Sequence, residues 1–303
     1  MALSCSNIIV IETLYSARIF GVIACTTTAI PITLLNALVL IAVWKTPALH
    51  KTSQILLANL ALTDLLVGVF GCPYLAYLHL AIINNWYTSF CFLSKILAVL
   101  ACILGGVSLY TLAFISIDRF LAIKLKFTYG TVVTNKRLII ALLVGWVVSG
   151  TLYIAAIIFF ETIPSDAVLI LFAVYIAVIL CTITIFYSMA FYHLKKVSSQ
   201  VFTSDANDHA PNATPAFDVN KYRRSLHTMV IVLLAIFIFY LPYCCVSALQ
   251  SAHKSEITKN FGVLTSLLIV FNSCANPILY LWRMKDLRQA VKTTVKGFLR
   301  LQT

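Results

Sequence analysis

The segment ILAVLACILGGVSLYTLAFISIDRFLAI, residues 96–123, contains 22 uncharged residues from Ile96 to Ile117, and the charged pair Asp118 and Arg119 follows directly. A helix needs about 20 apolar residues to cross the ~30 Å hydrocarbon core of a bilayer. The segment is therefore long enough to span a membrane, and its two charges fall where such a span would end.

The chain contains seven stretches of this kind. They lie at 19–44, 52–94 (interrupted by Asp64), 96–117, 138–160, 167–194, 225–253 and 260–282. The sequence is 61% hydrophobic and only 11% charged, whereas about a quarter of the residues in a soluble domain are charged. The strands of a membrane barrel are shorter and alternate strictly, and these stretches do neither. We therefore predict an all-α fold, a seven-transmembrane helix bundle.

The basic residues predict the orientation of this bundle. With the N-terminus outside the cell, 18 of the 22 Lys and Arg residues lie on the cytoplasmic side. Such a bias is typical of membrane proteins and sets their topology. The net charge of +12 therefore indicates anionic lipid headgroups and cytosolic partners, and no nucleic acid. We expect a multi-pass protein of the plasma membrane with a cytoplasmic C-terminus.

The sequence divides into three parts. A short extracellular N-terminus (1–17) precedes the seven-transmembrane domain (18–282), and a tail (283–303) follows it. Within the tail, Met284, Leu287, Val291, Val295 and Leu299 recur every three or four residues, which predicts an amphipathic helix on the inner membrane surface. The expected spans are about 18–45, 53–80, 92–124, 137–160, 167–196, 222–251 and 258–282, with a cytoplasmic loop at 198–221.

Polar residues inside the spans are the first candidates for function, because they are costly in a membrane. Asp64 is the only acidic residue in the middle of a span, and Asn36 and Ser108 also lie deep. The cluster FNSCANPILY, residues 271–280, adds Asn272, Asn276, Pro277 and Tyr280. Pro277, and Pro242 in the sixth span, should kink their helices and act as hinges.

In this order along the chain, the motifs resemble those of rhodopsin-like (class A) G-protein-coupled receptors over nearly the whole sequence. The matching elements are Asn36, LALTD (60–64), DRF (118–120), Trp146, Tyr187, Phe239, Pro242 and NPILY (276–280). The segments KTPALHKTSQ (45–54), VVTNKR (132–137) and ETIPSD (161–166) are most similar to the melanocortin, lysophospholipid, cannabinoid and adenosine receptor cluster.

The resemblance implies a set of switch residues for G-protein coupling. Asp118 would restrain Arg119 until the sixth span moves outward. The remaining members of the set are Tyr187, Tyr240, Pro242, Asn276, Pro277 and Tyr280. Tyr240 stands where most of the family has a Trp, and KYRRSLH (221–227) lacks the usual acidic partner for the Arg. The weaker restraint leads us to expect high basal activity.

The resemblance also implies an allosteric sodium ion, with no other cofactor, at Asp64, Ser108, Asn272 and Asn276. A buried carboxylate needs a counter-ion or a proton, so a protonated or hydrogen-bonded Asp64 is the alternative. The family's disulfide at the top of the third span is not reproduced, because ETIPSD has no cysteine. A bridge between Cys5 and Cys91 is one option, and a free Cys91 is the other.

The resemblance places a ligand among the outer halves of the third, fifth, sixth and seventh spans. The expected lining is aromatic and almost uncharged, and it favours a small apolar or weakly polar ligand or a short peptide. Its residues are Tyr74, Tyr77, Leu97, Ala101, Gly105, Phe172, Tyr175, Tyr240, Tyr243, Ser247 and Leu268. Alternatively, several of these tyrosines are interfacial packing residues.

The sequence thus predicts a receptor, rather than an enzyme, that signals to heterotrimeric G proteins, with arrestin, a receptor kinase and membrane lipids as further partners. Its six histidines lie at span ends or in loops, so they form no embedded metal cluster. A transporter would show repeated broken helices and paired midplane charges, and the sequence shows neither. A constitutively active or dimerising receptor without a ligand of its own stays an alternative.

Overall fold

A computed structural model describes the backbone of residues 12–159, 165–205, 219–252 and 255–300. Within these ranges the side chains at 12–14, 87–99, 101–102, 127, 152–153, 156–159, 165–169, 171–172, 197–205, 219–229, 232 and 256 are not described. The described backbone contains helices and no strand, which confirms the predicted all-α fold.

The long helices are α1 (Glu12–Lys45), α2 (Thr52–Leu66), α3 (Cys72–Ile83), α4 (Tyr87–Leu125), α6 (Asn135–Phe159), α7 (Ser165–Asp205), α8 (Val219–Ala252), α9 (Glu256–Arg283) and α10 (Lys285–Arg300). Short helical segments connect them: η2 (Pro47–Leu49), η3 (Val67–Gly71), η4 (Lys126–Thr128) and α5 (Tyr129–Val132). Because α2, η3 and α3 follow one another without a gap, they form one span.

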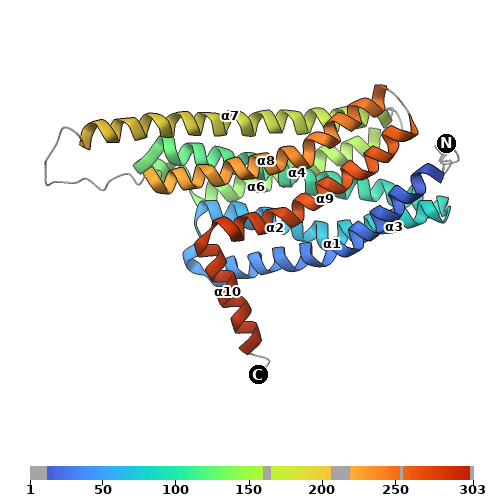
Figure 1. Cartoon of the computed structure of the whole chain (residues 1–303), viewed down its shortest axis with the longest axis horizontal. Helices are drawn as coiled ribbons and strands as arrows, with labels where there is room; N and C mark the ends of the chain where they lie inside the picture. The colour runs from blue at the N-terminus through green and yellow to red at the C-terminus, as the bar shows by residue number, and fades with distance from the viewer. Residues whose placement is uncertain (1–11, 160–164, 206–218, 253–254, 301–303) are drawn as a thin grey trace.

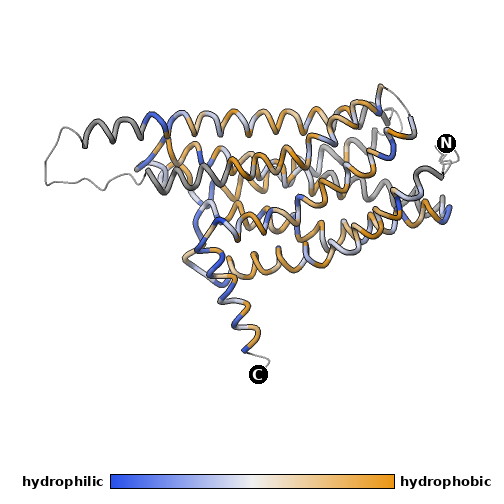
Figure 2. Tube along the Cα trace, viewed as in Figure 1, coloured by the Kyte–Doolittle hydropathy of each residue, from blue (hydrophilic) through white to orange (hydrophobic). Residues whose placement is uncertain are grey.

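These helices form a seven-helix bundle (Figure 1). Among the described residues, six spans are long and apolar enough to cross a membrane, and α6 is the further member of the bundle. Hydrophobic residues run along the length of the helices, and hydrophilic ones gather toward their ends (Figure 2). The chain is a multi-pass membrane protein.

Helix α4 is the centre of the bundle and packs against α2, α3, α6 and α7. Helices α1, α4, α7 and α9 end on the side that contains Arg119, which we call the Arg119 end. The second span, α6 and α8 run the other way and end at the opposite end of the bundle, where α1 begins (Figure 1). The largest hydrophobic core cluster joins most of the helices, and Leu109, Leu112 and Ile115 of α4 belong to it.

Helix α10 lies across the Arg119 end and points away from the bundle axis (Figure 1). Its apolar face packs against α1, with Leu287 and Val291 buried. Its other face carries basic residues. Hydrophilic and hydrophobic residues therefore alternate along the helix (Figure 2). The structure therefore contains the C-terminal amphipathic helix that the sequence predicts.

The second span contacts α1 closely at Gly68, which lies in the π-helical turn η3. A Cβ atom built on Gly68 would lie 2.6 Å from Oγ1 of Thr33 and 2.9 Å from its backbone nitrogen. Only a residue without a side chain allows the backbones of α1 and η3 to approach each other this closely.

We therefore expect Gly68→Ala to destabilise the protein by about 1–3 kcal/mol through overpacking, seen as a lower Tm of the purified chain. Gly150→Ala is the matched control, because no atom lies within 4 Å of a Cβ built on Gly150. An unchanged Tm for Gly68→Ala would show that α1 and η3 can separate at no cost.

Candidate functional site

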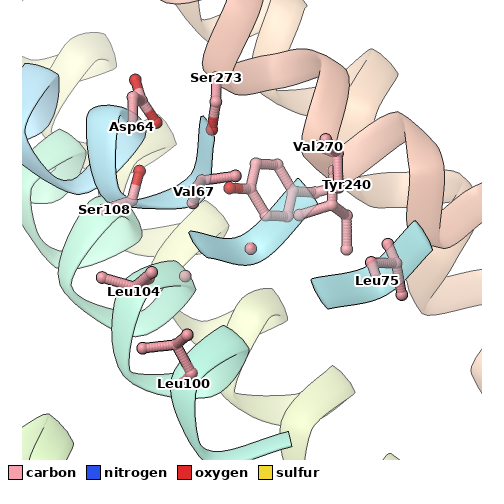
Figure 3. A pocket seen from close by; sticks show the side chains of 12 residues that line it. Asp64, Val67, Leu75, Leu100, Leu104, Ser108, Tyr240, Val270 and Ser273 are labelled. Carbon is pink, nitrogen blue, oxygen red and sulfur yellow. The ribbon is translucent and has the colours of Figure 1, made fainter. Parts of the chain in front are cut away.

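A cavity of about 110 Å³ lies in the middle of the bundle between the second span, α4, α8 and α9. Figure 3 shows the side chains that line it. Four of its twelve lining residues are polar, namely Asp64, Ser108, Tyr240 and Ser273. The others are aliphatic residues or glycine: Val67, Gly71, Leu75, Leu100, Leu104, Gly105, Ile269 and Val270. The cavity is therefore mostly apolar, and its polar atoms are concentrated around Asp64.

The carboxylate of Asp64 is 1% exposed and accepts a hydrogen bond of 2.9 Å from Nδ2 of Asn276. Ser108 contributes a hydroxyl from α4 to the same cavity, and the hydroxyl of Tyr240 points toward this polar group (Figure 3). Asn272, also 1% exposed, lies one helical turn before Asn276 on α9. The structure thus brings Asp64, Ser108 and Asn276 together, and Asn272 is buried one helical turn from Asn276 on α9.

This group of residues fits a sodium ion. Within the described part of the chain, both buried amide atoms of Asn272 make no hydrogen bond, and the buried hydroxyl of Ser108 is close enough to that of Tyr240 to interact with it. Carboxylate, hydroxyl and amide oxygens are hard ligands that suit an alkali cation, and burial makes the negative charge of Asp64 costly without one. Asp64, Ser108 and Asn272 are therefore the residues of this chain that could hold such an ion.

Pro277 lies inside α9 and cannot donate a hydrogen bond to the carbonyl of Ser273, four residues earlier. Asn36 of α1 donates to this carbonyl instead, over 3.1 Å from its Nδ2 atom. Asn36 also donates to the carbonyl of Ile32 in its own helix. The amide therefore joins α1 to α9 at the point where the proline weakens α9.

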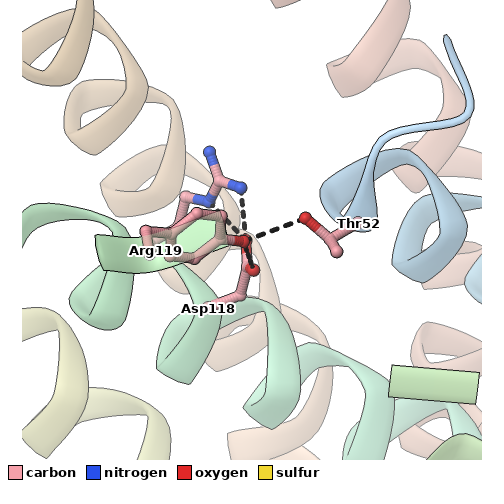
Figure 4. A network of polar contacts seen from close by, with 4 residues as sticks. Thr52, Asp118 and Arg119 are labelled. Atoms are coloured by element: carbon pink, nitrogen blue, oxygen red, sulfur yellow. Dashed lines mark hydrogen bonds and ion pairs between the residues drawn. The ribbon is translucent and has the colours of Figure 1, made fainter. Parts of the chain in front are cut away.

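The charged pair Asp118 and Arg119 forms a network of polar contacts at the Arg119 end (Figure 4). Arg119 donates from Nε to Oδ2 of Asp118 over 3.0 Å, and its Nη2 atom contacts the same oxygen. The hydroxyl of Tyr129 donates to Oδ1 of Asp118, and it also lies 3.0 Å from Oγ1 of Thr52. Both carboxylate oxygens of Asp118 are thus engaged, and the network connects α4 to α5 and α2.

Tyr129 lies in the short segment between the third and fourth spans. Its partial burial, together with the hydrogen bond to Asp118, raises the pKa of its phenol to about 12. Since the phenol stays protonated at physiological pH, it can act as a permanent donor to Asp118. The side chain of Arg119 is 21% exposed and that of Asp118 is 3% exposed, so the guanidinium is the more accessible member of the pair.

The three tyrosines among the other predicted switch residues are buried in the interior of the bundle. Tyr187 of α7 and Tyr280 of α9 are both 5% exposed, and Tyr240 of α8 is 2% exposed. Tyr187 is close enough to Arg119 to interact with it electrostatically. Pro242 lies inside α8 two residues beyond Tyr240.

The predicted ligand lining is only partly gathered around one cavity. Gly105 and Tyr240 line the cavity described above. The other residues with described side chains (Tyr74, Tyr77, Tyr175, Tyr243, Ser247 and Leu268) lie outside its lining. The hydroxyl of Tyr175 donates to the carbonyl of Gly106 over 3.2 Å, and the ring of Tyr77 lies 6.1 Å from that of Trp86. The side chains of Leu97, Ala101, Phe172 and Cys91, and all of Cys5, lie outside the described residues.

The structure also shows polar residues that the sequence analysis did not single out. Asn59 of α2 accepts a hydrogen bond from the indole of Trp146 over 3.1 Å and donates to Thr111 of α4 over 2.8 Å. Together with Tyr129 and Thr52, these residues fix the Arg119 half of the bundle. A second polar residue five positions before Asp64 in the same apolar helix was the available signal for Asn59.

Comparison with known proteins assigns this architecture. Residues 35–280 match the family model of the 7 transmembrane receptor (rhodopsin family). The chain belongs to this family. It is therefore a class A G-protein-coupled receptor, as its motifs predict, and its family is one of receptors rather than enzymes.

The receptor has several relatives of similar distance. It is 24% identical over 285 residues to the allatostatin-A receptor of Bombyx mori, covering 85% of this chain and 74% of the relative. It is 25% identical over 284 residues to the adenosine receptor A3 of Ovis aries, with 86% and 85% covered. It is 26% identical over 276 residues to the histamine H2 receptor of Canis lupus familiaris, with 84% and 73% covered. These relatives support the class and include receptors from inside and outside the cluster that the sequence analysis favoured.

Proposed function

We propose that this receptor transmits an extracellular ligand signal to heterotrimeric G proteins through outward movement of α8. The observation that carries the proposal is the network in which Asp118 binds Arg119 while accepting a hydrogen bond from Tyr129. This arrangement holds in place the guanidinium of Arg119, whose side chain is 21% exposed. Release of Arg119 toward Tyr187 and Tyr280 would offer it to a partner that enters from that side.

We propose the plasma membrane as the location, with the Arg119 end in the cytoplasm and the start of α1 outside. The basic side chains support this orientation, since 18 of the 22 Lys and Arg residues then face the cytosol. The basic face of α10 would lie on anionic lipid headgroups. Arrestin and a receptor kinase would use the same cytoplasmic surface.

We propose that the ligand and the sodium ion both bind in the central cavity. An ion held by Asp64, Ser108 and Asn272 would neutralise the carboxylate in the resting receptor. The apolar majority of the lining favours a small apolar or weakly polar ligand. Ligand binding would shift the population toward the open state only through its higher affinity for that state.

The restraint on Arg119 is expected to be incomplete. The segment KYRRSLH (221–227) lies in the first turns of α8 and contains no acidic residue that could pair with Arg119. Arg119 is then restrained mainly by Asp118 and its neighbours, and not by α8. We therefore propose that the active state is substantially populated without ligand.

The function is tested by measuring G-protein activation in cells that express the receptor, first without ligand and then with lipid and peptide libraries. Arg119→Ala is the control variant, because it removes the guanidinium and leaves the helix intact. We expect a basal signal above that of untransfected cells, and its loss in Arg119→Ala. Equal signals from wild type, variant and untransfected cells under every condition would contradict the proposal.

A further inference from the structure

A second polar site lies at the opposite end of the bundle from Arg119, between α1 and α3. His79, in the last turns of α3, is only 5% exposed. Within the described part of the chain, neither ring nitrogen of His79 has a hydrogen-bond partner. Two unsatisfied polar atoms on one buried side chain are costly, since each unmade hydrogen bond costs about 1–3 kcal/mol.

Arg18 of α1 faces the same place. Its Nε atom is buried and also has no hydrogen-bond partner in the described residues. Its guanidinium is close enough to His79 to interact with it electrostatically. Neither Arg18 nor the His79 ring provides the negative charge that would balance the guanidinium.

The position of the His79 ring is fixed by Gly21, which lies one helical turn after Arg18. A Cβ atom built on Gly21 would lie 2.7 Å from both Cδ2 and Nε2 of His79. The ring therefore packs directly on the backbone of α1, where a side chain would displace it. The absence of a side chain at residue 21 lets Arg18 and His79 share one surface of α1.

No acidic side chain in the described part of the chain can supply the missing acceptor. Asp64 precedes His79 by 15 residues on the same span, which corresponds to about 22 Å along a helix. Asp118 and Asp286 lie at the Arg119 end. Among the described side chains Arg18 thus has no acidic partner, and a partly buried cation in this situation favours the uptake of a counter-charge.

We propose that Arg18 and His79 form a binding site for an anionic oxygen group, a carboxylate or a phosphate, separate from the central cavity. Arg18 would donate to the group from its planar guanidinium, which matches such oxygens well. His79 would donate from one ring nitrogen and so fix the second oxygen. The group could belong to a lipid headgroup or to a soluble molecule, because lipid-facing residues such as Phe20 and Ile23 flank Arg18 and are at least half exposed.

The test is the thermal unfolding of the receptor purified in an uncharged maltoside detergent. Three probes are added separately: inorganic phosphate, acetate and the anionic lipid phosphatidylglycerol. We expect at least one probe to raise the Tm of the wild type by about 3 °C at saturation. Stabilisation by phosphate or acetate indicates a soluble source of the anion, and stabilisation by the lipid alone indicates a headgroup.

Arg18→Gln should remove this rise in Tm, and Lys259→Gln should retain it as a matched loss of one positive charge at the same end. His79→Phe keeps an aromatic ring without nitrogen and should weaken the response at least fivefold in half-saturating concentration. If Arg18→Gln does not fold, the response of His79→Phe tests the anion site instead. The proposal is overturned if no probe stabilises the wild type, or if the response survives in both site variants. Neither result bears on G-protein activation.

Discussion

Stabilisation of the purified receptor by sodium ions should disappear in Asp64→Asn. Asp64 is the one carboxylate among the described residues that line the central cavity, and the variant keeps its size while removing its charge. An ion that binds only the folded state stabilises it by about 1.4 kcal/mol at ten times its Kd. The wild type should therefore unfold about 3 °C higher in sodium chloride than in choline chloride of equal ionic strength.

The matched control for this experiment is Asp286→Asn, which removes an exposed carboxylate at the start of α10. It should retain the full sodium response, since its carboxylate lies far from the cavity. Ser108→Ala should weaken the response without abolishing it. A wild type that unfolds at one temperature in both salts would mean that Asp64 is protonated or satisfied by hydrogen bonds alone.

Asp118→Asn should raise ligand-free G-protein activation by up to about tenfold. The variant breaks the ion pair with Arg119, and a hydrogen bond to a charged group contributes about 1.5–3 kcal/mol. Since 1.4 kcal/mol corresponds to a factor of ten in an equilibrium, even partial loss of this interaction would shift the resting population strongly. The measurement is the basal signal in cells, normalised to the amount of receptor at the surface.

Tyr129→Phe separates the two parts of this restraint. It removes one hydrogen bond to Asp118 but leaves the Asp118–Arg119 pair, so we expect a smaller rise of about twofold to fivefold. Tyr192→Phe is the matched control, because Tyr192 lies on α7 and is 68% exposed. Basal signals that are equal in Asp118→Asn and wild type would show that Asp118 does not restrain Arg119.

Much of the fold could be predicted because the membrane imposes a simple rule on the sequence. A span must be long and uncharged. The uncharged runs that flank Asp64 and precede Asp118 can therefore be recognised as spans from the sequence alone. The central location of Asp64 could be predicted for the same reason, since an isolated acid in such a run must face the bundle interior.

The neighbours of the candidate site residues could be predicted less well, because loop geometry and helix irregularity decide them. Tyr129 reaches Asp118 only because the chain reverses after α4, where Lys126 adopts a positive φ of 47°. The π-helical turn η3 changes which residues of the second span face α1 and the cavity. Neither feature has a periodic signal, so Tyr129, Gly68 and the boundaries of the cavity needed the structure.

We propose that α8 moves away from α4 when a G protein binds. The most direct test of this movement is the distance between spin labels placed at Lys124 of α4 and Ser225 of α8 in the purified receptor. Adding nucleotide-free G protein should lengthen this distance by several ångströms in the wild type and leave it unchanged in Arg119→Ala. A distance distribution that is the same with and without G protein in the wild type would show that α8 does not move when the G protein binds.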